Sequence, residues 1–454
     1  MFDTKTDLRN DNTSNRTRRT AGDDQYALNF AYMYGYPLLE FGKYVATFPG
    51  ASVNTIYHDR QLSTSSVFKV IRPNVDTLYS TVFVDLSSHD LAITVPDIQD
   101  RYWVWPFYDP YGNVVGEIGS LQGHQPGKWL VRFADRDFGI HQGSPQGTNG
   151  YVGYINFPAA YGILLGRIAT TPTAADQKLA NQFQDQVEVD SVKRNAEPMA
   201  PPLNLSMLTL PEHRPSDKAS IPQAVLRLTA ALADYNQSPA FTCPPNVDLS
   251  GGPKYAETQS RAALNADKID LGNNWSLNFP GCQGAFGPHY AARYYIAKRG
   301  YLSLTTDQAI YPSLKGHLQV GADEAILLRF PRKPVLIPSG FWSVTAYNRA
   351  QYLIPNEQNR YCIGDRDDMT FVDGTPLSEE SKDGEFCILL QPADVTPRPR
   401  WRCNWLPLPA GGGEFSITVR WYGARKEMYT ALTNAFVPKF EWTKAITQSQ
   451  KSKL

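Results

Sequence analysis

The sequence predicts a mainly β protein of the α+β class, with two antiparallel β-sandwich or jelly-roll-like modules joined by a helical connector. Short runs rich in β-branched and aromatic residues, separated by Gly, Pro, Asn or Asp, recur at intervals of roughly ten residues. These runs form two blocks, with a more helical and more interrupted stretch between them. The chain also contains 33 Gly and 34 Pro residues, which is typical of a loop-rich β protein.

The N-terminal part of the chain predicts an arm, a long helix and a sheet-rich module. Residues 1–21 are polar and charged without periodicity, so we expect a disordered arm. Apolar residues at helical spacing predict a helix over about Asp23–Thr47, which Pro37 should kink or split. Residues 22–171 form the predicted N-terminal module, and its strands are expected in the runs VFKVI, TLYSTVFVDL, LAITV, RYWVWPFYD, KWLVRF and YVGYINF.

Residues 172–308 are predicted to form the helical connector and residues 309–454 the C-terminal module. Amphipathic periodicity predicts connector helices over Ala174–Val192, Ile221–Tyr235 and Pro288–Gly300, with Pro-rich connections between them. Strand-like runs then return, and we expect strands in AILLRF, FWSVTAYN, YCIG, FCILLQ and FSITVRWY.

The composition argues against several classes of partner. The 454-residue chain carries 44 Lys and Arg residues against 44 Asp and Glu residues, so it lacks the excess positive charge of a nucleic-acid-binding surface. No apolar run approaches the roughly 18 residues of a membrane-spanning helix. Aromatic residues make up 12% of the chain, enough to line a site for an apolar small molecule. A homo-oligomer is compatible with these data.

Glycosylation sequons point to the secretory pathway. Chance alone would place about two N-x-S/T triplets in a chain of this length. The sequence contains five, which begin at Asn12, Asn15, Asn204, Asn236 and Asn274. The N-terminus shows no apolar signal-peptide region, so our hypothesis is a secreted protein whose leader is missing from this chain. A cytoplasmic location is the alternative.

The five cysteines fit no C-x-x-C pattern, so neither a zinc ribbon nor a thioredoxin-like motif is predicted. In a secreted protein, Cys243 could pair with Cys282 and Cys362 with Cys387, which would leave Cys403 free. The alternative is five reduced thiols in or near cores.

The usual signatures of cofactor and metal enzymes are missing from the sequence. Neither H-E-x-x-H nor G-x-S-x-G occurs, no G-x-G-x-x-G follows a strand, and no phosphate-binding G-x-x-x-x-G-K-[ST] is present. We therefore predict a protein that uses no cofactor and no metal.

The segment Arg72-Pro73-Asn74-Val75-Asp76-Thr77-Leu78-Tyr79 predicts a turn that leads into a strand. One interpretation is a turn-stabilising network in which Asn74 closes the turn and Asp76 binds its amides. The other is that Arg72, Asn74 and Tyr79 point polar groups into a pocket, where they bind and polarise a ligand carbonyl.

The run Tyr102–Asp109 predicts an unusually aromatic strand. Period two places Trp103, Trp105 and Phe107 on one face, where they either fill a sandwich core or line an apolar cavity. Trp342, Tyr347 and Trp405 of the second block allow the same two interpretations.

Several strings resemble a two-module family. KVIRPNVDTLYS, RYWVWPFYDPYGN, EIGSLQG and LLGRIATTPTAADQ resemble the N-terminal domain of unknown function 1254. AIYP, FWSVTAYN, LIPNEQNRYCIGDRD, NWLPLPAG and ITVRWYG resemble its usual partner, domain of unknown function 1214. The order matches over most of residues 26–425, and the resemblance implies two β-sandwich-like modules joined by helices. Within this family, the chain resembles the fungal tropolone–sesquiterpenoid hetero-Diels–Alderases of secondary metabolism.

Two classes of function follow. The first is a cofactor-independent cyclase, a pericyclase of hetero-Diels–Alder type that joins a tropolone quinone methide to a sesquiterpene alkene. The second is a secreted carbohydrate- or lipid-binding module without catalysis, and a glycoside or ester hydrolase is a further alternative. For the cyclase, the candidate catalytic residues are Arg72, Tyr79, Tyr108 and His124. The candidate substrate-binding residues are Asn74, Trp103, Trp105, Phe107, Trp342 and Tyr347.

Overall fold

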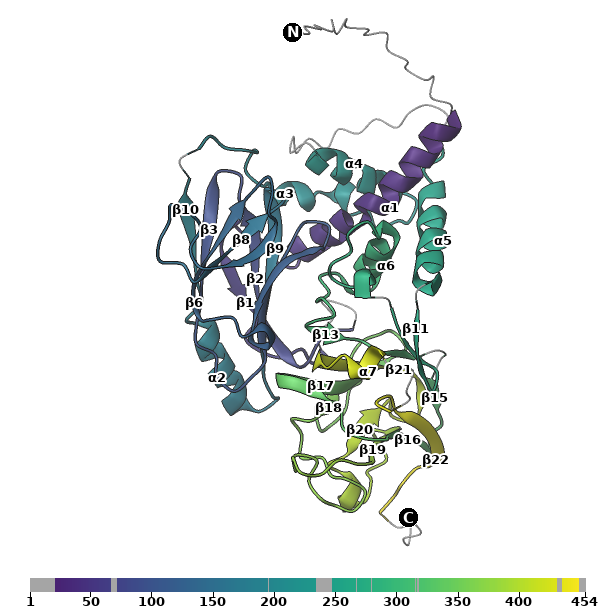
Figure 1. Ribbon diagram of the computed structural model, residues 1–454. Helices are drawn as coiled ribbons and strands as arrows, with labels where there is room; N and C mark the ends of the chain where they lie inside the picture. The colour runs from purple at the N-terminus through teal and green to yellow at the C-terminus, as the bar shows by residue number, and fades with distance from the viewer. Residues whose placement is uncertain are drawn as a thin grey trace, which may run out of the picture.

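The computed structural model of the chain contains two β-sandwiches and a group of helices (Figure 1). It describes residues 21–448 apart from 67–71, 195, 234–246, 267, 279, 315, 317 and 431–434. The predicted arm and the run VFKVI therefore lie outside the described residues, the arm except for Ala21. The N-terminal sandwich lies beside the helices, and the C-terminal sandwich lies below both in the view of Figure 1.

The N-terminal sandwich consists of two five-stranded sheets. The first sheet has the order β1 (Ile56–His58), β2 (Thr77–Asp85), β9 (Tyr161–Ala169), β4 (Trp103–Tyr108) and β5 (Val114–Gly119). The second has the order β10 (Glu188–Lys193), β3 (His89–Val95), β6 (Gly127–Phe133), β8 (Gly153–Phe157) and β7 (Gly139–Gln142). Pairing is antiparallel except between β6 and β8.

The C-terminal sandwich also has two sheets. One has the order β13 (Ala309–Ile310), β21 (Gly413–Ala424), β17 (Leu336–Asn348) and β18 (Cys362–Gly364), with β15 (Leu318–Val320) added on β21. The other has the order β20 (Trp405–Leu408), β19 (Phe386–Pro392), β16 (Glu324–Phe330) and β22 (Lys439–Lys444). A small separate sheet contains β11 (Ile269–Gly272), β12 (Trp275–Leu277) and β14 (Ser313–Leu314).

The helices pack mainly around α1. They are α1 (Ala21–Val45), α2 (Ala174–Gln184), α3 (Leu205–Leu208), α4 (Ile221–Ala233), α5 (Gly251–Ala266), α6 (Tyr290–Gly300) and α7 (Glu427–Thr430). Short 3-10 turns are η1 (Ser120–Gln122), η2 (Pro211–His213), η3 (Pro280–Cys282) and η4 (Pro399–Trp401). Within the described ranges, no helix is both long and apolar enough to cross a membrane.

The mainly β, two-sandwich prediction is confirmed, and three local predictions need correction. The helix expected over Ala174–Val192 ends at Gln184, because residues 188–193 pair with β3 as an edge strand. The helix α1 is continuous through Pro37, so Pro37 does not split it. The region between the predicted helices Ile221–Tyr235 and Pro288–Gly300, expected to be a Pro-rich connection, contains the 16-residue helix α5.

The core of the N-terminal sandwich is aromatic and closely packed. Trp103, Trp105 and Phe107 point from β4 into this core, as period two predicts, and Trp105 has no exposed surface. The indole of Trp105 lies directly over Gly166 of β9, since a Cβ built on Gly166 would come within 2.1 Å of the ring. Of the two interpretations of these rings, the structure supports core packing.

We predict that Gly166→Ala destabilises the protein by about 1–3 kcal/mol, because the added methyl group overlaps the Trp105 ring. The measurement is urea unfolding followed by tryptophan fluorescence. The matched control is Gly300→Ala, because Gly300 lies at the end of helix α6 with open space around it. Gly50 also has open space, but its φ of 74° would strain an alanine, so it is not used as a control. A Gly166→Ala variant as stable as Gly300→Ala would contradict the prediction.

The predicted Cys362–Cys387 bridge is wrong, since both residues are free thiols. Cys362 lies on β18 and packs on a cluster with Val75 and Tyr361 outside the sandwich core. On β19 the neighbours of Cys387, Phe386 and Ile388, point into that core, so Cys387 faces away from it. The two thiols therefore lie on opposite outer faces of the C-terminal sandwich. Cys243 lies outside the described residues.

Candidate functional site

A polar cluster lies on the outer face of the first sheet, where the N-terminal sandwich, the helices and the C-terminal sandwich meet. On β9 the outward residues Ile163 and Leu165 pack against the helices, whereas Ala169 packs against the C-terminal sandwich. Arg167 stands between these two apolar contacts. The outer face of the sheet is therefore covered at both ends and carries a charged side chain in between.

Arg167 is 5% exposed, and its guanidinium is held by neutral groups. Its Nη2 atom donates to the carbonyl oxygen of Leu302 at 2.7 Å and to the phenol oxygen of Tyr108 at 3.5 Å. The guanidinium lies 5.5 Å from the ring centre of Tyr79, which is its cross-strand partner on β2.

No salt bridge to Arg167 is formed among the described side chains, and its charge acts on the carboxyl of Glu117, whose pKa it lowers. Its Nε atom is buried and makes no hydrogen bond there either. An arginine cannot lose its proton to relieve this burial, so the arrangement favours a ligand that brings a negative or partly negative oxygen. Tyr79 and Tyr311 are half-buried beside it, and Arg167 lowers the pKa of both phenols against the larger, raising effect of burial.

The carbonyl that anchors Arg167 belongs to a strained residue. Leu302 has a φ of 63°, in the left-handed region that a branched side chain rarely adopts. Its carbonyl oxygen also accepts a hydrogen bond of 3.0 Å from the Tyr108 phenol. Strain of this kind persists where the surroundings fix the backbone, and here it aims one carbonyl at two donors of the cluster.

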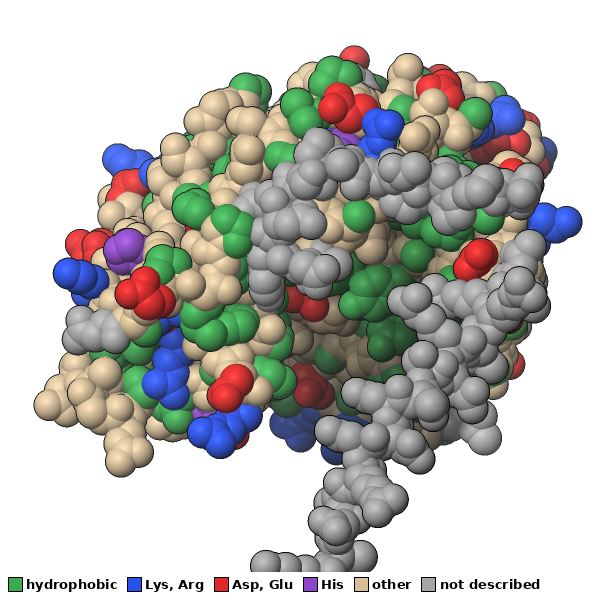
Figure 2. Space-filling view, turned by 90° about the horizontal axis from the view of Figure 1, so that it is seen from above, with side chains coloured by type: hydrophobic (Ala, Val, Ile, Leu, Met, Phe, Trp, Pro, Cys, Tyr) green, Lys and Arg blue, Asp and Glu red, His purple; other side chains and the backbone are tan. Residues whose placement is uncertain are grey.

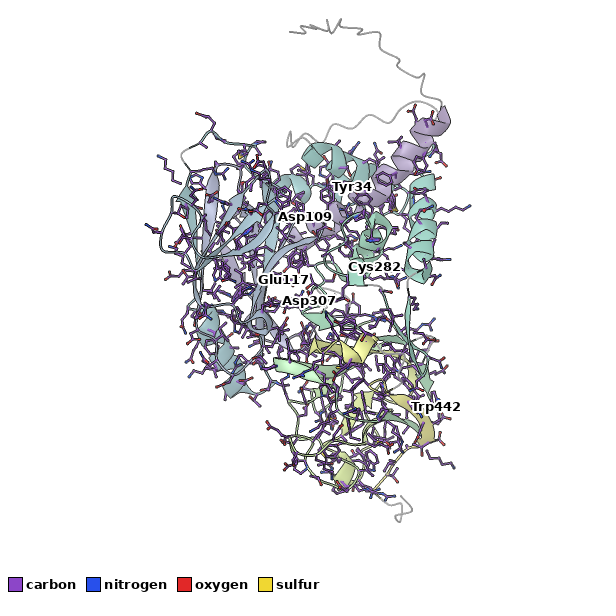
Figure 3. The ribbon with its side chains drawn as sticks, viewed as in Figure 1. Tyr34, Asp109, Glu117, Cys282, Asp307 and Trp442 are labelled. Carbon is purple, nitrogen blue, oxygen red and sulfur yellow. The ribbon has the colours of Figure 1, made fainter. Side chains whose placement is uncertain are left out.

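Glu117 of β5 brings a carboxyl group to the same face. It lies opposite Pro106 of β4 and accepts hydrogen bonds from the Thr305 amide at 3.2 Å and the Thr305 hydroxyl at 2.6 Å. Burial raises the pKa of this half-buried carboxyl to about 7, against the lowering effects of the Thr305 hydrogen bonds and of the Arg167 charge, and the charge of nearby Asp307 adds to the rise. Glu117 and Asp307 lie where the three parts of the molecule meet (Figure 3). A carboxyl that titrates near neutrality can donate or accept a proton.

Seen from above, the molecule is hollowed beside the N-terminal sandwich (Figure 2). Most of the wall visible in this view is hydrophobic, and acidic side chains are visible within it. Half-buried Tyr44 of α1 lies near Tyr79 and Arg167 and adds an aromatic ring on the helical side. The geometry therefore combines a cationic hydrogen-bond donor and a carboxylic acid with apolar surroundings.

The segment from Arg72 to Asp76 joins the two sandwiches instead of entering this cluster. Arg72 is exposed, and its Nε atom donates to the side-chain oxygen of Gln351 at 2.7 Å. Asn74 closes its own turn by accepting from the Asp76 amide at 2.6 Å, as predicted, and donates to the Tyr422 phenol at 2.9 Å. These contacts place Arg72 and Asn74 at the module junction.

Asp76 is fully buried at this junction and binds the other module. One carboxylate oxygen pairs with Arg366 at 2.7 Å, and the other accepts from the Ser343 hydroxyl at 2.8 Å and lies 4.0 Å from Arg420. Its carboxylate therefore binds side chains of the C-terminal module, and not the turn amides that the sequence interpretation assigned to it. The polar residues Arg72, Asn74 and Asp76 therefore contribute to docking of the two modules.

The remaining predicted site residues are distributed outside the cluster. Trp103, Trp105 and Phe107 fill the N-terminal core, and Trp342 lies in the C-terminal core. His124 accepts a hydrogen bond of 3.0 Å from the Gly119 amide, and burial lowers its pKa. Tyr347 donates to the Pro73 carbonyl at 3.0 Å, so it belongs to the junction. The structure thus brings together Tyr79 and Tyr108 from the predicted set.

Arg167, Glu117 and Tyr311 were not predicted from the sequence. A signal for the first was present, because Arg167 is the one charged residue of the run YGILLGRIA, which is otherwise apolar or glycine. Glu117 is likewise the one charged residue of the run VVGEIG. In the part of the chain that the structure describes, no group of three or more His, Cys, Asp or Glu side chains is placed to hold a metal ion.

Fold and site together define a two-sandwich protein with a polar site where its parts meet. Family models match residues 53–191 as a protein of unknown function, DUF1254, and residues 314–426 as a protein of unknown function, DUF1214. The chain therefore belongs to the family that combines these two modules, as its sequence strings predicted.

Two solved structures align with most of this chain. The VPA0106 protein of Vibrio parahaemolyticus aligns with a TM-score of 0.60 and 19% identity, over 93% of this chain and 100% of that chain. An uncharacterized protein of Burkholderia cenocepacia aligns with a TM-score of 0.43 and 12% identity, over 94% of this chain and 96% of that one. The similarity to the Vibrio protein is evidence for the fold alone. A comparison with curated proteins finds no match.

Proposed function

We propose that the protein is a cofactor-independent cyclase that joins a tropolone quinone methide to a sesquiterpene alkene by a hetero-Diels–Alder reaction. The observation that carries the proposal is the buried guanidinium of Arg167, which lies between two tyrosines and forms no salt bridge with a described side chain. In such a reaction negative charge grows on the oxygen of the heterodiene. A preorganised cationic donor in a desolvated site stabilises that charge more in the transition state than in the substrate.

Glu117 supplies the proton chemistry that forms the heterodiene. Its carboxyl, when protonated, gives a proton to the hydroxyl of a hydroxymethyl tropolone, the C–O bond breaks and water leaves. The ring hydroxyl returns a proton to the Glu117 carboxylate, which leaves a neutral quinone methide. The oxygen and the exocyclic carbon of this molecule then form one C–O and one C–C bond with the alkene. Nothing is oxidised or reduced.

The apolar surroundings suit the alkene partner. Holding two reactants in near-attack geometry can remove roughly 7–11 kcal/mol of barrier in the best intramolecular cases. The half-buried rings of Tyr44 and Tyr79 offer surfaces for an oily substrate. A sugar-binding module would need an exposed aromatic strip, whereas the exposed rings of the described residues are separate: Tyr26 lies on α1, Phe138 in the loop before β7 and Trp442 on β22.

The direct test is product formation from a hydroxymethyl tropolone and a humulene-type alkene. Purified protein is expected to accelerate adduct formation and to give one stereoisomer in excess, compared with buffer. A rate and stereochemistry equal to those in buffer would contradict the proposal.

The pH dependence tests the role of Glu117. With a pKa of about 7, its carboxyl is protonated and able to donate below that pH, so the dehydration rate is expected to fall as pH rises through about 7. Glu117→Gln should lower the rate below pH 7 and abolish this decline. Glu188→Gln, an exposed carboxyl on β10, is the matched control and should keep the wild-type profile. Equal profiles for both variants would remove Glu117 from the mechanism.

We further propose that the protein passes through the secretory pathway. Among the sequons on described residues, Asn274 is exposed in the turn between β11 and β12. We expect an intact mass of native protein above the polypeptide mass, lowered by an N-glycosidase and by Asn274→Gln. A native mass equal to that of the bare chain would contradict secretion with glycosylation.

A further inference from the structure

A second cavity lies between the two modules, away from the Arg167 cluster. It has a volume of about 410 Å³, within the range of small-molecule sites. The N-terminal module lines it with α2, the segment 60–64 and residues 170–172, and the C-terminal module lines it with residues 359–362, Arg366 and Asp367. In Figure 1, α2 is the helix on the side of the N-terminal sandwich nearest the C-terminal module.

One face of α2 forms a polar wall of this cavity. Ala174, Gln177, Lys178 and Asn181 line it, and their spacing of three and four residues places them on one side of the helix. The Oδ1 atom of Asn181 is buried and has no hydrogen-bond partner within the described part of the chain. It is an acceptor that a ligand N–H or O–H could satisfy.

The cavity carries one uncompensated positive charge. Each lining arginine already has a carboxylate partner: Arg60 binds Asp185 at 2.7 Å, Arg360 binds Asp367 at 3.3 Å and Arg366 binds Asp76 at 2.7 Å. Lys178 makes no ion pair with any side chain in the ranges that the structure describes. An anionic group of a ligand is therefore attracted to its ammonium.

The lining of the cavity also includes apolar side chains, those of Leu62, Val75, Pro172 and Tyr361. We propose that this inter-module cavity binds a small amphiphilic organic anion. Its acidic group contacts Lys178, a hydrogen-bond donor contacts Asn181, and its apolar body lies against Leu62 and Tyr361.

Such a ligand would also strengthen the module junction. Arg366, which lines the cavity, donates to the Asp76 carboxylate and to the Thr170 carbonyl at 3.0 Å. A molecule bound here contacts both modules at once, so it stabilises the docked arrangement by mass action. The site is independent of the proposed cyclase reaction.

The probe for the test is 1-anilinonaphthalene-8-sulfonate, which combines a sulfonate, an N–H donor and two apolar ring systems. We expect saturable binding to the full chain, seen as a rise in probe fluorescence, and a higher thermal midpoint at saturation. Lys178→Glu should weaken this binding about tenfold, through reversal of one charge. Ala174→Trp, which fills the cavity from the exposed side of α2, should abolish it.

The controls separate this cavity from the rest of the molecule. Lys254→Glu makes the same charge change on exposed α5 and should leave the affinity unchanged. Arg167→Met should also leave it unchanged. Equal affinities for wild type, Lys178→Glu and Ala174→Trp would overturn the proposal, as would loss of probe binding in Arg167→Met alone.

Discussion

Replacing Arg167 by methionine is expected to lower the rate of adduct formation by about two to three orders of magnitude. This is the usual cost of removing one preorganised donor from a developing oxyanion. Arg167 is buried in this site, and its guanidinium forms no salt bridge with a described side chain that would compete with substrate. The measurement is the initial rate with hydroxymethyl tropolone and alkene, corrected for the reaction in buffer.

Folding and catalysis can be separated in this variant. Methionine has a similar length and removes a buried, uncompensated charge, so the thermal midpoint should change little. Arg132→Met on β6 is the matched control, because Arg132 also lies on a strand and over a tyrosine ring, at 4.9 Å from the centre of Tyr154. It should retain the wild-type rate. An Arg167→Met enzyme within twofold of wild type would contradict the role of Arg167.

The two tyrosines of the cluster are expected to contribute differently to the rate, because their hydrogen bonds differ. The Tyr108 phenol is buried and already donates to Leu302, whereas the half-buried Tyr79 donates no hydrogen bond to another described side chain. Tyr79→Phe is therefore expected to lower the rate more than Tyr108→Phe. This difference reports which phenol faces substrate.

Local pattern in the sequence predicts strands here but does not predict their neighbours. Alternation along β2 correctly separates Leu78 and Val82, which enter the core, from Tyr79, which does not. The partner of Tyr79 is Arg167, 88 positions later, because β9 inserts between β2 and β4. Pairing over such a separation depends on the whole sheet, so the cluster emerges only with the topology. Packing of Trp105 in the core likewise depends on Gly166 of β9, because the missing side chain leaves room for the indole.

The partners of Asp76 could not be predicted from the sequence for the same reason. Its composition fits a turn, and Asn74 does close one. The partners of Asp76 lie in another module, at Ser343, Arg366 and Arg420. A polar string that looks like a ligand site can therefore be a docking site between parts of one chain.

Asp76→Asn is expected to be the most destabilising conservative substitution in the protein. The side chain keeps its shape, but Arg366 and Arg420 lose their shared counterion in a region where Asp76 is fully buried and Arg420 is 4% exposed. Breaking a buried ion pair from one side typically costs about 3–5 kcal/mol, because it leaves an uncompensated charge. We expect a thermal midpoint lower by about 5–10 °C, measured by circular dichroism.

A second substitution distinguishes lost charge balance from lost packing. Arg366→Met added to Asp76→Asn removes one of the stranded charges, so the double variant should be more stable than Asp76→Asn alone. Glu414→Gln is the surface control, because the Arg349–Glu414 pair has side chains 82% and 45% exposed and such pairs contribute about 0–1 kcal/mol. If Asp76→Asn were as mild as Glu414→Gln, the two modules would be held together by their apolar contacts, with Tyr102 against Phe341 and Tyr422, and the buried ion pair would set only their orientation.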